Sequence, residues 1–188
     1  MLKKIKKELD ERMKVREEAL KMQRNVVPLC AQAIRSLLAG KKKQAKNKLK
    51  EAEKIIKKAE KLLKKHPDLV KTVLGNAYQE YAEAMILASY LEMKKLPEVK
   101  VPAEYYLTGL GDAIGELKRF GMQLLARGKV EEAGELLKSM EDLYYEFSQF
   151  VYPGSIAPGL KKKQDVARAV LNSFQDAYTN AVIKKGTN

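Results

Sequence analysis

Hydrophobic residues recur at helical spacing along almost the whole chain, whereas the alternation typical of strands is weak. The stretches with this spacing are separated by short segments that contain glycine or proline, which interrupt helices. They cover about residues 2–39, 42–65, 68–93, 102–127, 129–151 and 158–185. The pattern predicts an all-α protein, an antiparallel bundle of about six to seven long helices joined by short connections.

Length and charge narrow the class of protein. The 188 residues suit one domain, which we expect to span residues 1–188. The formal net charge is +13, and the phosphates of a nucleic acid are the leading partner for so basic a chain. An anionic membrane surface is the second candidate partner, and a lysine- and glutamate-rich surface adapted to heat is a third explanation of the charge.

The compartment is indicated by the one cysteine and by the absence of long apolar runs. Cys30 lies among apolar residues and is expected to be a buried filler, which favours a reducing environment. No apolar run approaches the roughly 20 residues needed to cross a bilayer. The basic N-terminus also lacks the apolar core of a signal peptide. We therefore expect a cytoplasmic protein with no membrane partner.

An acidic pair interrupts the third helical stretch. Between residues 77 and 88 only Gln79, Glu80 and Glu83 are polar, and a helix this apolar on all sides is expected to be buried. Glu80 and Glu83 are three residues apart and so project from one face. Buried carboxylates are unfavourable unless they are paired, protonated or bound to a cation. The alternative is a solvated strip at the edge of the bundle.

A second acidic stripe lies in the fourth helical stretch. Thr108, Asp112 and Glu116 are four residues apart and form one narrow polar line. Glycines accompany this line, and each interior glycine costs a helix roughly 1 kcal/mol relative to alanine. These glycines are Gly109, Gly111, Gly115 and Gly121. We expect the close approach of another helix or of a ligand; the alternative is tight packing beside an incidental acidic stripe.

The two acidic pairs are predicted to meet. A short link at about residues 96–101 joins the two helices, which should therefore pack antiparallel. One pair lies roughly 15 residues before the link and the other roughly 10–15 residues after it, so both should fall at similar heights. Four carboxylates without histidine or cysteine favour Mg²⁺ or Mn²⁺, and the lack of a Glu-x-x-His pair disfavours a diiron site. Such a metal site can orient a phosphodiester and activate water.

Several segments resemble the translin family, and the resemblance covers nearly the whole chain. They are Arg16-Glu17-Glu18, Ala33-Ile34-Arg35-Ser36-Leu37-Leu38, Tyr105-Tyr106-Leu107-Thr108-Gly109-Leu110 and the segment from Leu160 to Val170. The acidic motifs are closest to the translin-associated factor X branch. Residues 79–84 resemble its Gln-Glu-Tyr-Val-Glu-Ala motif, and residues 111–117 resemble its Ala-Asp-Leu-Thr-Gly-Glu-Leu motif.

The resemblance implies both a fold and a function. It implies a translin-like helical domain and a ribonuclease centre formed by Glu80, Glu83, Asp112 and Glu116. It also implies a homo-oligomer, as large as an octamer, because the family forms closed shells around single-stranded RNA or DNA. The arginine-rich binding segments of the family are not closely reproduced in this chain.

Arginines are the predicted contacts for nucleic-acid phosphates. Arg16, Arg24 and Arg35 lie in the first helical stretch, and the last two are eleven residues apart, which places them on one face. Arg119 follows Glu116 by three residues and could hold a phosphate beside the metal. The alternative for each arginine is a surface ion pair.

Taken together, these patterns favour a protein that binds single-stranded nucleic acid and cleaves single-stranded RNA as a Mg²⁺-dependent endoribonuclease. A non-catalytic protein that binds single-stranded RNA or DNA is the first alternative. A helical scaffold with no nucleic-acid role is the second. The dependence of RNA affinity on salt separates the scaffold from the other two.

Overall fold

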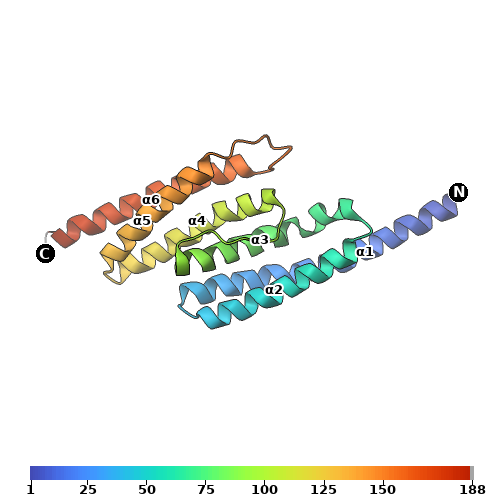
Figure 1. Cartoon of the computed structure of the whole chain (residues 1–188), viewed down its shortest axis with the longest axis horizontal. Coiled ribbons are helices and arrows are strands. Elements are labelled where there is room, and N and C mark those ends of the chain that lie inside the picture. The colour runs from blue at the N-terminus through green and yellow to red at the C-terminus, as the bar shows by residue number, and fades with distance from the viewer. Residues whose placement is uncertain (187–188) are drawn as a thin grey trace. The chain divides into compact units, whose positions relative to one another are not determined.

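The computed structural model describes residues 1–186 and is built from helices (Figure 1). They are α1 (Leu2–Leu38), α2 (Lys42–Leu63), α3 (Pro67–Met93), α4 (Ala103–Ala126), α5 (Val130–Ser148) and α6 (Leu160–Gly186). Residues 1–186 contain no strand, so the predicted all-α class is confirmed. Within the same residues, no helix is both long enough and apolar enough to cross a membrane.

The helix boundaries lie close to those expected, except at the end of α5. The sequence pattern extends the helix to about residue 151, whereas α5 ends at Ser148. The side-chain amide of Gln164 donates hydrogen bonds of 2.9 Å to the carbonyls of Phe147 and Phe150. The bond to Phe147 occupies a carbonyl that a helix extended to residue 151 would have used, and the bond to Phe150 satisfies a carbonyl of the connection toward α6.

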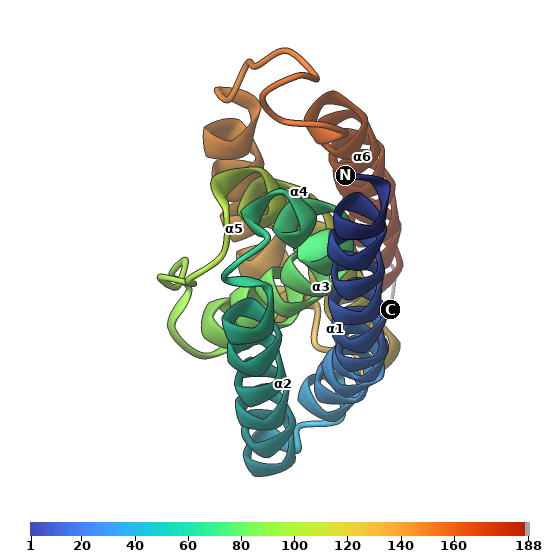
Figure 2. The ribbon, with the colours of Figure 1, turned by 90° about the vertical axis from the view of Figure 1, so that its right-hand side faces the viewer.

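The chain forms two compact units, residues 1–84 and residues 85–188, and α3 continues through the boundary between them. The first unit is an antiparallel hairpin of α1 and α2, together with the first part of α3 (Figures 1 and 2). Tyr78 of α3 donates a 2.8 Å hydrogen bond to Glu60 of α2, which ties these two helices together.

The turn between α1 and α2 has a specific backbone geometry. Gly40 has a φ of +73°, a conformation that glycine adopts without steric cost. The N–H of Gly40 donates to the carbonyl of Leu37 at 2.9 Å, and the N–H of Lys41 donates to that of Ser36 at 2.8 Å. This pair of bonds is the Schellman arrangement that closes helix C-termini, so it stops α1 and reverses the chain.

The N-terminal part of α1 is exposed. The first buried residue of α1 is Ala19, and the apolar side chains of Leu2, Ile5, Leu9 and Met13 are open to solvent. These four residues follow helical spacing and form one stripe, which we call the α1 stripe. An exposed apolar line of this kind is typical of a surface that contacts another molecule.

In the second unit, α4, α5 and α6 pack against one another. Phe147 and Phe174 are fully buried in its core. A Cβ added to Gly121 of α4 would lie 2.1 Å from the ring of Phe174, and one added to Gly111 would lie 2.8 Å from the Cβ of Lys163. These two glycines therefore let α6 approach α4 closely, as expected for the glycines of this helix.

Candidate functional site

The acidic pair of α3 lies in an apolar setting. Glu83 is only 9% exposed, Glu80 is half-buried, and the neighbouring Tyr81, Ala82 and Ala84 are buried. The prediction that this part of the helix is buried is confirmed, and an exposed strip is excluded for Glu83. Because water cannot fully solvate these carboxylates, they need compensating interactions.

Other ionisable groups in the first unit respond to the same environment. Burial, followed by the negative charges of Glu80 and Glu83, raises the pKa of Cys30 to about 12. Burial also raises the pKa of Tyr81 to about 12, with smaller contributions from Glu53 and Cys30. Both groups therefore stay neutral at physiological pH, and Cys30 is the buried, unreactive thiol that was expected. Added negative charge is therefore disfavoured in this environment.

Asp112 of α4 forms an ion pair with Lys163 of α6. The lysine ammonium donates to both carboxylate oxygens, at 2.5 and 2.7 Å, and the two side chains are 26% and 27% exposed. The absence of a side chain at Gly111 allows Lys163 to lie this close. Lys163 was not among the residues singled out in the sequence. It belongs to a run of three lysines, and only the packing of α6 on α4 determines which of them reaches Asp112.

Glu116 has a weaker partner. Its Oε2 lies 3.5 Å from an Arg119 guanidinium nitrogen, and this oxygen is buried without a hydrogen bond within residues 1–186. A buried carboxylate oxygen left in this state is unfavourable, so it is a ready acceptor for a further donor or a cation. Gly115, directly before it, has open space where a Cβ would lie.

The four predicted carboxylates can be judged as metal ligands by their arrangement and by their donor atoms. Among residues 1–186, no group of three or more histidine, cysteine, aspartate or glutamate side chains is arranged to hold a metal ion. The donor types nevertheless suit Mg²⁺ or Mn²⁺, which prefer carboxylate oxygens. Metal binding by Asp112 would require Lys163 to give way. The four-carboxylate site formed by Glu80, Glu83, Asp112 and Glu116 stays a prediction.

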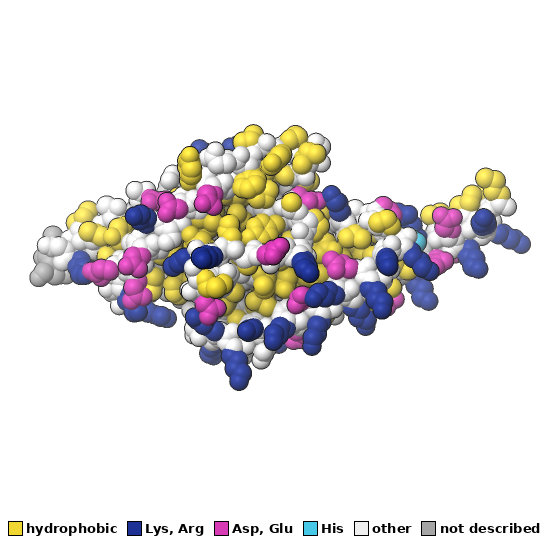
Figure 3. Space-filling model, viewed as in Figure 1, with side chains coloured by type: hydrophobic (Ala, Val, Ile, Leu, Met, Phe, Trp, Pro, Cys, Tyr) yellow, Lys and Arg dark blue, Asp and Glu magenta, His cyan; other side chains and the backbone are white. Residues whose placement is uncertain are grey.

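The predicted phosphate contacts have different surroundings. Arg24 and Arg35 are exposed on α1. Arg16 pairs with its neighbour Glu17 at 2.5 Å, and Arg119 pairs with Glu116, so for these two the ion-pair alternative is observed. Arg35 lines a hollow together with two further cationic side chains, those of Lys41 and Lys48. Lysine and arginine side chains gather along α1 and α2 (Figure 3).

Comparisons with known proteins agree with this fold. The Translin family model matches residues 93–185. An uncharacterized protein of Methanocaldococcus jannaschii is 34% identical over 161 residues, which are 84% of this chain and 72% of that protein.

Solved structures extend the comparison over the whole chain. AfC3PO in complex with duplex RNA has a TM-score of 0.89 at 28% identity, covering 100% of this chain and 99% of that one. The crystal structure of AfC3PO has a TM-score of 0.90 at 29% identity and covers 97% of both chains. Apo-NeC3PO, at 23% identity, shares the fold with a TM-score of 0.85 over 96% of both chains. Residues 93–185 thus match the translin family, and the helical fold of the chain is that of the C3PO proteins.

Proposed function

We propose that this protein binds single-stranded nucleic acid and cleaves single-stranded RNA by hydrolysis of phosphodiester bonds. The observation that carries the proposal is the burial of Glu83 beside Glu80 in an apolar helix, a setting in which carboxylates are found paired, protonated or bound to a cation. The match of residues 93–185 to the Translin family model and the likeness to a structure that contains RNA support the nucleic-acid part of the proposal.

Each residue has a role in this proposal. Glu80, Glu83, Asp112 and Glu116 would hold Mg²⁺ or Mn²⁺, which supplies charge stabilisation at the phosphate and lowers the pKa of a bound water. One of the carboxylates would also accept the proton of the attacking water. Arg119, which pairs with Glu116, would contact a phosphate beside the metal, and Arg16, Arg24 and Arg35 on α1 would contact the rest of the strand.

Self-association belongs to the same proposal. The structural relatives are C3PO proteins, and we infer that this chain also forms a homo-oligomer, as large as an octamer. The exposed α1 stripe supports this inference, because a line of apolar side chains gains free energy when it is covered.

Replacing both α3 acids tests the catalytic part. The double variant Glu80→Gln with Glu83→Gln should cut labelled single-stranded RNA about a hundredfold more slowly or worse in Mg²⁺, because it removes metal ligands and a candidate base. Its affinity for RNA should stay within a few-fold of the parent. Glu8→Gln with Glu11→Gln is the matched control, since these acids have the same spacing but are exposed on α1. Undiminished cleavage by the α3 variant would show that catalysis does not use this site.

A non-catalytic binding protein is the second candidate, and the ion pairs of α4 favour it. Asp112 and Glu116 already have cationic partners in Lys163 and Arg119, so these two acids are compensated without a metal. A parent protein that binds RNA with a steep salt dependence but does not cut it in Mg²⁺ or Mn²⁺ would establish this reading. An affinity for RNA that is weak and independent of salt would instead indicate a helical scaffold.

A further inference from the structure

A hollow lies between α1 and α2 beside the turn that joins them. Its volume is about 240 Å³, and cations and hydrogen-bonding side chains form most of its wall. The lining residues are Gln32, Arg35, Ser36, Ala39, Lys41, Gln44 and Lys48. None of the described residues lining it is acidic, and within residues 1–186 only Lys48 of its three cations has an acidic partner nearby, Glu51 at 3.8 Å.

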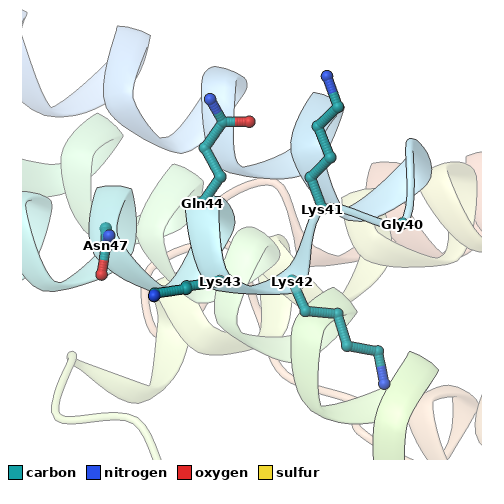
Figure 4. Close-up of a pocket in the computed structure, with 6 residues that line it drawn as sticks. All are labelled: Gly40, Lys41, Lys42, Lys43, Gln44 and Asn47. Carbon is teal, nitrogen blue, oxygen red and sulfur yellow. The ribbon is translucent and has the colours of Figure 1, made fainter.

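The turn itself adds to this basic surface. A shallower, open hollow of about 610 Å³ adjoins it and shares Lys41 and Gln44 with it. In Figure 4 the side chains of Lys41 and Gln44 extend to the same side of the turn, whereas that of Lys42 extends to the other side. Lys41 and Gln44 are therefore directed together, and Lys42 contributes charge from a different direction.

The turn between α4 and α5 provides a comparison within the same chain. It has the same backbone geometry, with Gly128 at a φ of +72° and the N–H of Lys129 bonded to the carbonyl of Leu124 at 3.0 Å. The first turn of α5 carries Glu131 and Glu132, and Lys129 pairs with Glu132 at 2.7 Å. A turn with this backbone geometry can therefore carry acidic residues beside its lysine, so the geometry alone does not require a cluster of cations.

The α1–α2 turn departs from that balance. The first turn of α2 contains no acidic residue, and Lys41, Lys42 and Lys43 follow one another at its start. Clustered cations repel one another, and the free energy of this repulsion is recovered when an anion lies between them. The hollow therefore has the charge and the donors of a site for a phosphate group: a forked guanidinium, two ammonium groups and side-chain amides. The Ser36 hydroxyl, which donates to the carbonyl of Gln32 at 2.9 Å, would have to turn to donate to the phosphate.

We propose that the hollow formed by Arg35, Ser36, Lys41, Gln44 and Lys48 binds a phosphate group of a nucleic-acid strand. The inference rests on the proposed nucleic-acid binding. It adds a defined site at residues 35–48, which are distant in sequence from the four carboxylates of the proposed metal site. The phosphate is either a terminal monoester or a diester within the strand. Arg35 would form paired hydrogen bonds to two phosphate oxygens, and the lysines would neutralise its charge.

The test compares two charge-matched variants. Arg35→Gln with Lys41→Gln removes two cations from the hollow, whereas Arg127→Gln with Lys129→Gln removes two cations from the α4–α5 turn. The affinity of each for labelled single-stranded RNA is measured by fluorescence anisotropy over a range of salt concentrations. We expect the first variant to bind about tenfold more weakly, with a salt slope smaller by about 0.7 for each lost phosphate contact. The control should stay within about twofold of the parent.

Two further measurements complete the test. The first identifies which kind of phosphate group binds in the hollow, and the second tests phosphate binding independently of the proposed RNA cleavage. A 5′-phosphorylated strand that binds the parent more tightly than its 5′-hydroxyl counterpart, but not the first variant, assigns the hollow to a terminal phosphate. Equal affinities for the two strands, with the loss in the variant retained, assign it to a diester. Calorimetry with inorganic phosphate needs no RNA, so binding by the parent that is lost in the first variant supports the hollow even if cleavage is never observed. Equal losses in both variants, or no loss in either, would overturn the proposal.

Discussion

At the scale of single residues, the candidate site is defined by how each carboxylate is compensated. Glu83 and Glu80 lie among buried apolar residues of α3, and Asp112 and Glu116 contact Lys163 and Arg119 of the second unit. Lys163 is the residue that changes the interpretation of α4, because it contacts both oxygens of Asp112. A lysine in that position competes directly with any metal ion for the carboxylate.

Lys163→Gln is therefore expected to strengthen metal binding. If Asp112 is a metal ligand, removing its cationic partner should raise the affinity for Mn²⁺ by roughly tenfold, about 1.4 kcal/mol, which is within the range for a charge pair near a protein surface. Calorimetric titration with Mn²⁺ measures the change. Lys161→Gln is the control, because Lys161 pairs with the exposed Asp165 on the same helix. An unchanged Mn²⁺ affinity in the Lys163 variant would remove Asp112 from the set of ligands.

At the scale of helices, the glycines of α4 have different roles although they share one helix. Gly121 receives the ring of Phe174, Gly111 receives Lys163, and Gly115 has open space beside it. The first two are explained by the approach of α6. No neighbouring atom requires a glycine at position 115. Gly115 lies next to Glu116, whose buried Oε2 has no hydrogen bond within the described residues.

Alanine substitutions should separate these roles. Gly121→Ala should lower the free energy of unfolding by about 1–3 kcal/mol, because the buried ring of Phe174 must move. Gly115→Ala should raise it by up to about 1 kcal/mol, since alanine favours the helix and meets no atom there. Urea denaturation followed by circular dichroism gives both values. Equal effects of the two substitutions would contradict the close packing of α6 on Gly121.

At the scale of the whole molecule, two surface features remain to be matched with partners. Basic side chains gather along α1 and α2, and the exposed α1 stripe of Leu2, Ile5, Leu9 and Met13 lies at the N-terminal end of α1. Phosphates are the natural partner of the first feature, and an apolar surface is the partner of the second. The proposed binding of nucleic acid and the proposed self-association thus use different kinds of surface.

The α1 stripe can be tested by making it polar. Leu9→Gln with Met13→Gln should lower the mass measured by light scattering, because it removes apolar area that association would bury. Lys7→Gln with Glu11→Gln changes the opposite side of the same helix and should leave the mass unchanged. Circular dichroism checks that both variants remain helical. A mass equal to that of the parent in the first variant would show that the stripe is not an interface.

The amino-acid sequence was enough to predict the helices, because helical periodicity and the positions of glycine and proline can be read within a single segment of the chain. It also determined the translin-like fold, the burial expected around Glu83, and the close approach expected at the glycines of α4. What it could not supply was the identity of side chains brought together from distant positions. Lys163 is 51 residues from Asp112, and the hollow at Arg35 depends on how α2 turns back along α1.

These pairings follow from the way the helices pack, because packing sets which of several similar lysines reaches a given carboxylate. The folded arrangement also brings the Gln164 amide to the carbonyls at the end of α5, and it places an aromatic ring against Gly121 but not against Gly115. Periodicity specifies which face of a helix is apolar, but the register between two packed helices depends on side chains from both. Contacts between helices are therefore a property of the assembled fold.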